Sequence, residues 1–143
     1  MEKIERFEGE YRWLSNFWTV KITYEGITYN STEAAFQASK TLNIEDRRRF
    51  SKMTAGESKK EGKKLDLRKD WDSVRLKIME DVLRLKFQDP VLNKLLRETG
   101  TVELIEGNHW HDNFWGVCDP RIGQNHLGKL LMKIRGGTHI TLD

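Results

Sequence analysis

The sequence is poor in cysteine and lacks long apolar runs, and each shortage excludes a class of protein. Cys118 is the only cysteine among 143 residues, so no disulfide can form within the chain and a reducing compartment is expected. No apolar run approaches the roughly 20 residues that a membrane-spanning helix needs. The opening residues, MEKIERFEGEYRW, are charged from the second position and do not resemble a secretory leader. We therefore expect a cytoplasmic protein that does not enter a membrane.

Features that divide or specialise a chain are also scarce. Pro90 and Pro120 are the only prolines, and the sequence contains no internal repeat, low-complexity tract or proline-rich linker. The stretch GESKKEGKK lacks the glycine and lysine spacing of a phosphate-binding P-loop. A single domain over residues 1–143 is expected, which is long enough to enclose a hydrophobic core.

Charge is nearly balanced, but the basic residues gather in the middle of the chain. The formal net charge is +3, and basic residues concentrate in EDRRRF and ESKKEGKKLDLRKDW. Two interpretations are open. The basic middle is either a solvated, lysine-rich surface or a rim that attracts phosphates or nucleic acid.

Hydrophobic periodicity predicts an α+β fold, mostly helical, around a small antiparallel sheet. Residues 18–30 alternate apolar and polar around Glu25-Gly26, which predicts a β-hairpin. A second extended segment is expected within 101–107. Helices are expected, in chain order, at residues 30–42 (capped by Asn30 or Ser31), in two short pieces within 45–64, and at 70–88, 90–100 and 123–135.

Glu33, Gln37 and Lys40 stand four and three residues apart, along one side of the helix predicted at 30–42. Glu33 has a structural interpretation, because Asn30 and Glu33 fit the spacing of a capping box. It also has a catalytic one. Neighbouring alanines allow close packing, and desolvation raises a carboxyl pKa toward the range of general acid–base catalysis.

A second carboxylate lies in the aromatic stretch NHWHDNFWGVC, residues 108–118. Asp112 either holds backbone amides of its own loop or faces a pocket. In the second case, Asp112 and Trp115 would face a sugar while Trp110 and Phe114 pack inward. Trp71 is likewise either the hydrophobic anchor of a helix start or the floor of a ligand pocket.

The sequence gives less support to a metal site or to a catalytic triad with a cysteine nucleophile. The zinc-competent residues His109, His111, Cys118 and His126 match no compact zinc-binding spacing. Nothing identifies an orienting group for a cysteine nucleophile. We expect neither a metal nor another cofactor.

Six short motifs in order give the chain a family resemblance. They are RWLSNFW (12–18), YNSTEAAFQASK (29–40), LRKDWDS (67–73), KF (86–87), DNFWG (112–116) and GQNHLGKLLMKIR (123–135). Together they span nearly the whole chain and resemble the NADAR family, also called YbiA-like. One departure follows DNFWG, where some members have a small glycine-rich turn and this chain has VCDP.

The resemblance implies a compact α+β domain that hydrolyses an N-glycosidic bond of ribose. The implied substrates are phosphoribosyl-pyrimidine intermediates of riboflavin synthesis, or ADP-ribose on guanine in DNA or RNA. The implied catalytic residues are Glu33, Asp112, Trp71 and, as a possible Schiff-base lysine, Lys40. The implied substrate-binding residues are Asn16, Phe17, Gln37, Arg68, Trp115, Gly116, Asn125 and Arg135.

Two other functions fit the same residues. One is a non-catalytic module that binds ADP-ribose or a nucleotide, and the other is a nucleic-acid-binding domain that uses the basic middle. In every case the protein is expected to act as a monomer.

Overall fold

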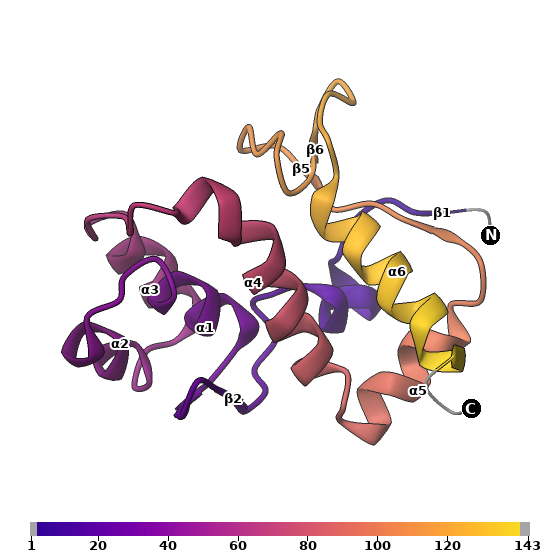
Figure 1. Ribbon diagram of the computed structural model, residues 1–143. Helices are drawn as coiled ribbons and strands as arrows, with labels where there is room; N and C mark the ends of the chain where they lie inside the picture. Colours follow the sequence, from indigo (N-terminus) through magenta and orange to yellow (C-terminus); the bar gives the residue numbers. More distant parts are fainter. Residues whose placement is uncertain (1–2, 141–143) are drawn as a thin grey trace. The chain divides into compact units, whose positions relative to one another are not determined.

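The computed structural model describes residues 3–140, and side chains through residue 136. The chain forms two compact units, which are described separately. The central unit runs from Asn16 to Lys86. The terminal unit combines the residues up to Ser15 with those from Phe87 onward. Figure 1 labels most elements of both units.

The central unit holds a hairpin and four helices among its residues. In chain order they are β2 (Ile22–Tyr24), β3 (Ile27–Tyr29), α1 (Thr32–Ala38), α2 (Ile44–Phe50), α3 (Ala55–Gly62) and α4 (Trp71–Lys86). The predicted hairpin is confirmed: β2 and β3 are antiparallel, with Ile22 opposite Tyr29. Glu25 and Gly26 both have positive φ, at 49° and 86°, as a two-residue hairpin turn requires.

Helix α1 is shorter than the predicted 30–42 and is buried on all sides. It begins at Thr32 because the Ser31 side chain accepts a hydrogen bond from the Ala34 amide at 3.0 Å. Every residue of α1 is buried, and the helix packs against α2, α3 and α4. A helix enclosed in this way presents its polar side chains to protein rather than to bulk water.

Two short helices within 45–64 were predicted and are observed as α2 and α3. The break lies between Phe50 and Ala55, and Gly56 and Gly62 are part of α3. Thr54 and Glu57 form a capping box at the start of α3. The chain therefore breaks where a new cap begins, and not at the glycines.

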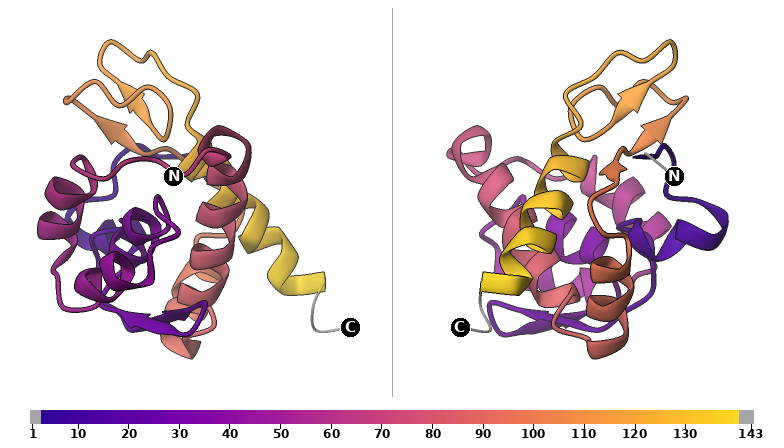
Figure 2. Two further views of the ribbon diagram at one scale, coloured as in Figure 1. Left: turned by 60° about the vertical axis from the view of Figure 1, so that its left-hand side comes forward. Right: turned by 90° about the vertical axis from the view of Figure 1, so that its right-hand side faces the viewer.

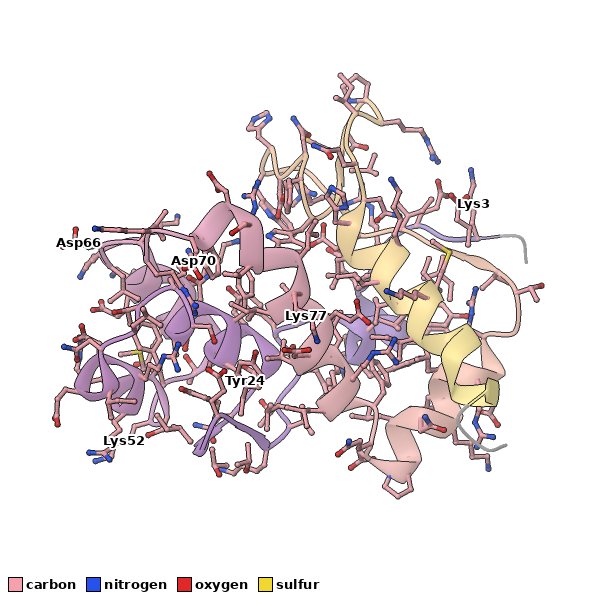
Figure 3. The ribbon with its side chains drawn as sticks, viewed as in Figure 1. Lys3, Tyr24, Lys52, Asp66, Asp70 and Lys77 are labelled. Atoms are coloured by element: carbon pink, nitrogen blue, oxygen red, sulfur yellow. The ribbon has the colours of Figure 1, made fainter. Side chains whose placement is uncertain are left out.

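Helix α4 lies within the predicted 70–88, and its apolar stripe is buried at Ile78, Met79, Val82 and Leu83. The Tyr24 hydroxyl donates to Asp81 at 2.9 Å, and Lys77 pairs with the same carboxylate; Tyr24 and Lys77 are labelled in Figure 3. These contacts join the hairpin to α4.

The terminal unit is built from short strand pairs and two packed helices. Its elements are β1 (Lys3–Ile4), the 3-10 helix η1 (Gly9–Leu14), α5 (Pro90–Glu98), β4 (Glu103–Leu104), β5 (Gly107–Asn108), β6 (Val117–Cys118) and α6 (His126–Ile140). Helix α5 packs on α6, and Asp89 caps α5 by accepting from the Val91 and Leu92 amides.

The predicted α+β class is confirmed, but the expectation of one antiparallel sheet is wrong in detail. Strands β1 and β4 are parallel, as are β5 and β6, which lie side by side in Figure 2. Only the β2–β3 hairpin is antiparallel among the strand pairs within residues 3–140. Over the same residues, no helix is both long and apolar enough to cross a membrane.

Candidate functional site

Glu33 is a buried carboxylate held by its neighbour on α1. The side chains of Glu33 and Gln37 are 8% and 6% exposed, and Gln37 Nε2 donates to Glu33 Oε2 at 2.7 Å. Because Ser31 caps α1, Glu33 is the second helical residue and Ala34 takes the position that a capping box requires. The capping-box interpretation of Glu33 with Asn30 is therefore wrong.

The other half of the Gln37 amide packs against α3. Gln37 Oε1 is buried and has no hydrogen-bond partner among the described residues. A Cβ atom added at Gly62 would lie 2.0 Å from this oxygen. Gln37 thus lies between Glu33 and the backbone of α3, which fixes its orientation.

Asn16 braces the start of α1. Its side-chain Oδ1 accepts from Thr32 Oγ1 at 2.8 Å, and its backbone oxygen accepts from the Glu33 amide at 3.1 Å. Its Nδ2 lies 3.5 Å from the Met79 sulfur. Asn16 therefore holds α1 in place beside α4.

Lys40 lies two residues beyond the end of α1, and not within the helix as predicted. Partial burial lowers the pKa of its amine, while the nearby negative charge of Glu33 opposes that shift and Lys63 adds to it. Lys40 is therefore near enough to Glu33 for their charges to interact, and its role in a ligand site stays a prediction. A lysine that deprotonates more easily is a better nucleophile.

Arg68 and Trp71 lie at the turn that starts α4. The Arg68 guanidinium holds Asp70 in a bidentate contact, at 2.7 and 3.1 Å, which raises the pKa of Arg68. Asp70 is labelled in Figure 3. The Trp71 ring is 6% exposed and packs against Phe36, with ring centroids 5.1 Å apart. The anchor interpretation of Trp71 is what the structure shows, and its contact with a ligand stays a prediction.

Phe17 is the most exposed of the predicted ligand-binding residues in the central unit. Its ring is 45% exposed, and the Lys59 amine lies 5.8 Å from the ring centroid. An exposed aromatic face beside a cation can stack on a base or sugar.

In the terminal unit, Asp112 organises its own loop. Its Oδ1 accepts from the Phe114 and Trp115 amides at 3.2 and 2.9 Å. The buried Asn108 side chain bonds both the amide and the carbonyl of Asp112. The loop-holding interpretation is thus observed. The other carboxylate oxygen of Asp112, Oδ2, receives no hydrogen bond from the residues that the structure describes.

The aromatic residues of this loop differ from the prediction in which of them are exposed. Trp110 is 46% exposed, so the expectation that it packs inward is wrong. Phe114 and Trp115 are half-buried and pack edge-on, with ring centroids 4.8 Å apart, and the His126 ring lies 4.5 Å from Phe114. The start of α6 therefore supports the ring beside Asp112.

Gly116 and Asn125 lie close together in this unit and have structural contacts. A Cβ atom at Gly116 would lie 1.8 Å from Glu106 Oε2, so only glycine fits. Asn125 uses both amide atoms on backbone, accepting from the Glu106 amide and donating to the Leu104 carbonyl, each at 3.0 Å. Substrate contacts by either residue stay a prediction.

Arg135 lies farther along α6. It follows His126 by nine residues, which is about 13 Å along a helix axis. Its guanidinium is largely buried and donates to Thr99 Oγ1 at 2.9 Å, and burial lowers its pKa. The structure thus places Arg135 against α5, apart from the Phe114–His126 contact.

Three residues with evident roles were missed by sequence reasoning: Asn108, Glu106 and Lys86. Asn108 is completely buried and also donates to Glu106 Oε2 at 3.1 Å. Lys86 is completely buried at the end of α4, and burial lowers its pKa to about 7. Lys86 falls on the apolar stripe three and four residues after Leu83 and Val82, so a charge on that stripe was the available signal.

The residues considered for zinc do not gather. Within the described part of the chain, no three His, Cys, Asp or Glu side chains are placed to hold a metal ion. His111 Nδ1 lies 3.6 Å from the Cys118 sulfur, and within the described residues no third side chain of these types completes a metal site with this pair.

Many side chains of the basic middle are paired with acids. The pairs are Arg47–Glu25, Arg48–Glu45, Arg49–Asp46, Lys64–Glu61 and Arg68–Asp70. Each pair neutralises a positive charge locally, so the stretch attracts phosphates less than its lysine and arginine content indicates.

Comparison with known proteins gives consistent matches over most of the chain. A family model described as the NADAR domain matches residues 4–137. The N-glycosidase YbiA of Escherichia coli is 38% identical over 133 residues, covering 88% of this chain and 81% of YbiA. An N-glycosidase of Nostoc punctiforme is 32% identical and covers 87% and 84%. A riboflavin biosynthesis protein of Vibrio vulnificus is 34% identical, covering 85% of this chain and 34% of that protein.

The fold is similar to a solved structure as well. The solution structure of the E. coli protein YbiA superimposes with a TM-score of 0.85 at 28% identity, covering 99% of this chain and 91% of YbiA.

Proposed function

Because this chain belongs to the NADAR family, as its motifs predict, we propose that it hydrolyses the C1′–N bond of a phosphorylated ribosyl metabolite. Family membership and the named relatives make it an N-glycosidase, a hydrolase. The class of substrate is the proposal. The observation that carries it is the buried Glu33 carboxylate, held by Gln37 and close enough to Lys40 to affect its pKa.

Glu33 is suited to stabilise positive charge on the sugar. Cleavage of a ribosyl C1′–N bond passes through a transition state with oxocarbenium character, which a fixed carboxylate stabilises electrostatically. The hydrogen bond from Gln37 holds the Glu33 carboxyl group in one orientation, because the amide N–H donates to Oε2. Burial strengthens the attraction between a Glu33 carboxylate and positive charge on the sugar, because the local dielectric is low.

Asp112 is suited to proton transfer. Two backbone amides fix its Oδ1, and Oδ2 is available to protonate the leaving nitrogen or to activate water. The held oxygen keeps the carboxylate in one orientation while the other exchanges a proton.

The ion pairs in the basic middle of the chain favour a small phosphorylated metabolite over a nucleic-acid substrate. A duplex footprint requires several unpaired cations along one surface. Here Arg47, Arg49 and Arg68 contact carboxylates at 3.0 Å or less. The Vibrio relative, a riboflavin biosynthesis protein, favours the same metabolic context.

Two substrates tested in parallel distinguish these possibilities. The purified protein is incubated with an early phosphoribosyl-pyrimidine intermediate of riboflavin synthesis and, separately, with DNA carrying ADP-ribosylated guanine. Products are followed by mass spectrometry. Release of the free base from the small molecule alone supports the proposal, and release of ADP-ribose from DNA alone contradicts it. Tight binding of either compound without product would identify a binding module instead.

A further inference from the structure

A pocket in the terminal unit is lined by none of the residues given a catalytic or substrate-binding role above, and Arg135 touches it only through Thr99. It has a volume of about 460 Å³ and is lined by Ile4, Glu10, Tyr11, Trp13, Leu95, Glu98, Thr99 and Val102. This volume lies within the range of small-molecule sites, roughly 300–1,000 Å³. Strand β1, η1, α5 and the segment that follows α5 form its walls; Figure 2 shows α5 and this segment in two further views.

The two helices of this pocket each present an apolar and an acidic side chain on one face. Glu10 and Trp13 are three residues apart in the 3-10 helix η1, where such side chains lie in line. Leu95 and Glu98 are three residues apart in α5 and also share a face. The pocket therefore has carboxylates next to apolar and aromatic walls.

The indole of Trp13 is held firmly in this wall. It is 8% exposed and packs edge-on against Phe87, with ring centroids 6.4 Å apart. A fixed indole is the aromatic side chain that attracts cations most strongly.

Charge in the pocket is net negative. Glu10 and Glu98 are exposed, and neither side chain has an ion pair or hydrogen bond with any residue that the structure describes. Arg135 reaches this region by donating to Thr99 Oγ1, but it is buried and is not a lining residue. Two carboxylates against one buried guanidinium repel phosphates, so the pocket does not suit the phosphorylated substrate proposed above.

From this combination we propose that the pocket binds a small organic cation with an apolar body, such as an aryl- or alkylammonium ion. The ammonium group lies between Glu10 and Glu98, where charge-assisted hydrogen bonds form. The apolar body packs against Trp13, Leu95 and Val102. This site is independent of the N-glycosidase reaction.

Three probes of one shape but different charge test the proposal. Phenethylammonium, neutral 2-phenylethanol and anionic 3-phenylpropionate are titrated into the 15N-labelled protein, and amide shifts of residues 9–14 and 95–102 are followed by NMR. Phenethylammonium is expected to bind at least about tenfold more tightly than the alcohol, since its hydrogen bonds are charge-assisted. Equal shifts with all three probes, or none with the cation, overturn the proposal.

A matched pair of double variants assigns the effect to the pocket. Glu10→Gln/Glu98→Gln is expected to lose the preference for the cation. Glu8→Gln/Glu103→Gln makes the same change in net charge at two exposed residues of the same unit outside the pocket, and should keep it. All four side chains are exposed, so both variants are expected to fold. Loss of the preference in both variants overturns the specific site. N-glycosidase activity measured alongside is expected to stay unchanged, so failure here does not affect the proposed function.

Discussion

At the scale of single residues, burial and two charged neighbours set the pKa of Lys40. Desolvation lowers the pKa of its amine, the negative charge of Glu33 opposes that shift, and Lys63 adds to it. A neutral amine can add to the aldehyde of a ring-opened ribose, whereas a protonated amine can hold a phosphate. Substitution by arginine would preserve the phosphate-holding role and abolish the role as a nucleophile.

The substitution Lys40→Arg separates these roles. It keeps the positive charge but removes Schiff-base chemistry, so a covalent route predicts a fall in kcat of about 100-fold or more. Borohydride added during turnover, followed by intact-mass spectrometry, should show a substrate adduct in the wild type and none in the variant. Full activity in Lys40→Arg, with no adduct in either protein, would restrict Lys40 to an electrostatic role.

At the scale of elements, the approach of α3 to α1 sets the orientation of Gln37 and, through it, of Glu33. Gly62 gives α3 its close contact, since a Cβ atom there would overlap the Gln37 amide. The hydrogen bond to Glu33 Oε2 depends on that amide. Packing between two helices thus positions the proposed catalytic carboxylate.

Two glycines of α3 provide a matched test. Gly62→Ala is expected to lower the free energy of unfolding by about 1–3 kcal/mol, as overpacking does, and to lower kcat by displacing Gln37. A Cβ atom added at Gly56 would have no heavy atom within 4 Å. Gly56→Ala should therefore leave the free energy of unfolding unchanged or slightly higher. Urea unfolding and steady-state kinetics measure both. If the two substitutions changed stability and kcat equally, the proposal that α3 positions Gln37 would be wrong.

The same elements show what a sequence can and cannot predict. Residues 18–30 predict the hairpin because its turn and alternation are local, and the α4 stripe predicts its helix for the same reason. The burial of α1 on all sides and the parallel pairing of β1 with β4 depend on partners far away in the chain. Glu33 and Asp112 could be selected as candidates from residue type, and the hold of Asp112 on its own loop was one of its two interpretations, but the burial of Glu33 could not be predicted.

At the scale of the whole molecule, stability is expected to depend on the titration of Lys86. Its folded pKa of about 7 lies below the ordinary value of 10.5. Between these values the unfolded chain binds more protons than the folded one, so stability rises as pH increases from about 7 to 10. The slope is at most about 1.4 kcal/mol per pH unit.

Chemical denaturation at pH 7, 8, 9 and 10 measures this dependence. The wild type should become more stable over the range, and Lys86→Met should show a flatter profile, whatever its absolute stability. A wild-type profile that falls between pH 7 and 10, or one that Lys86→Met leaves unchanged, contradicts a buried amine with a lowered pKa.

The proposed function depends on Glu33 and Asp112 as the reacting carboxylates. The most direct measurement is kcat/KM of Glu33→Gln and Asp112→Asn on whichever ribosyl substrate the wild type cleaves, with circular dichroism to verify folding. Both amides keep an oxygen that accepts the observed hydrogen bonds, so the local structure is preserved. Both variants are expected to fold and to lose about 100-fold or more of kcat/KM. Unchanged kcat/KM in both variants would contradict this proposal.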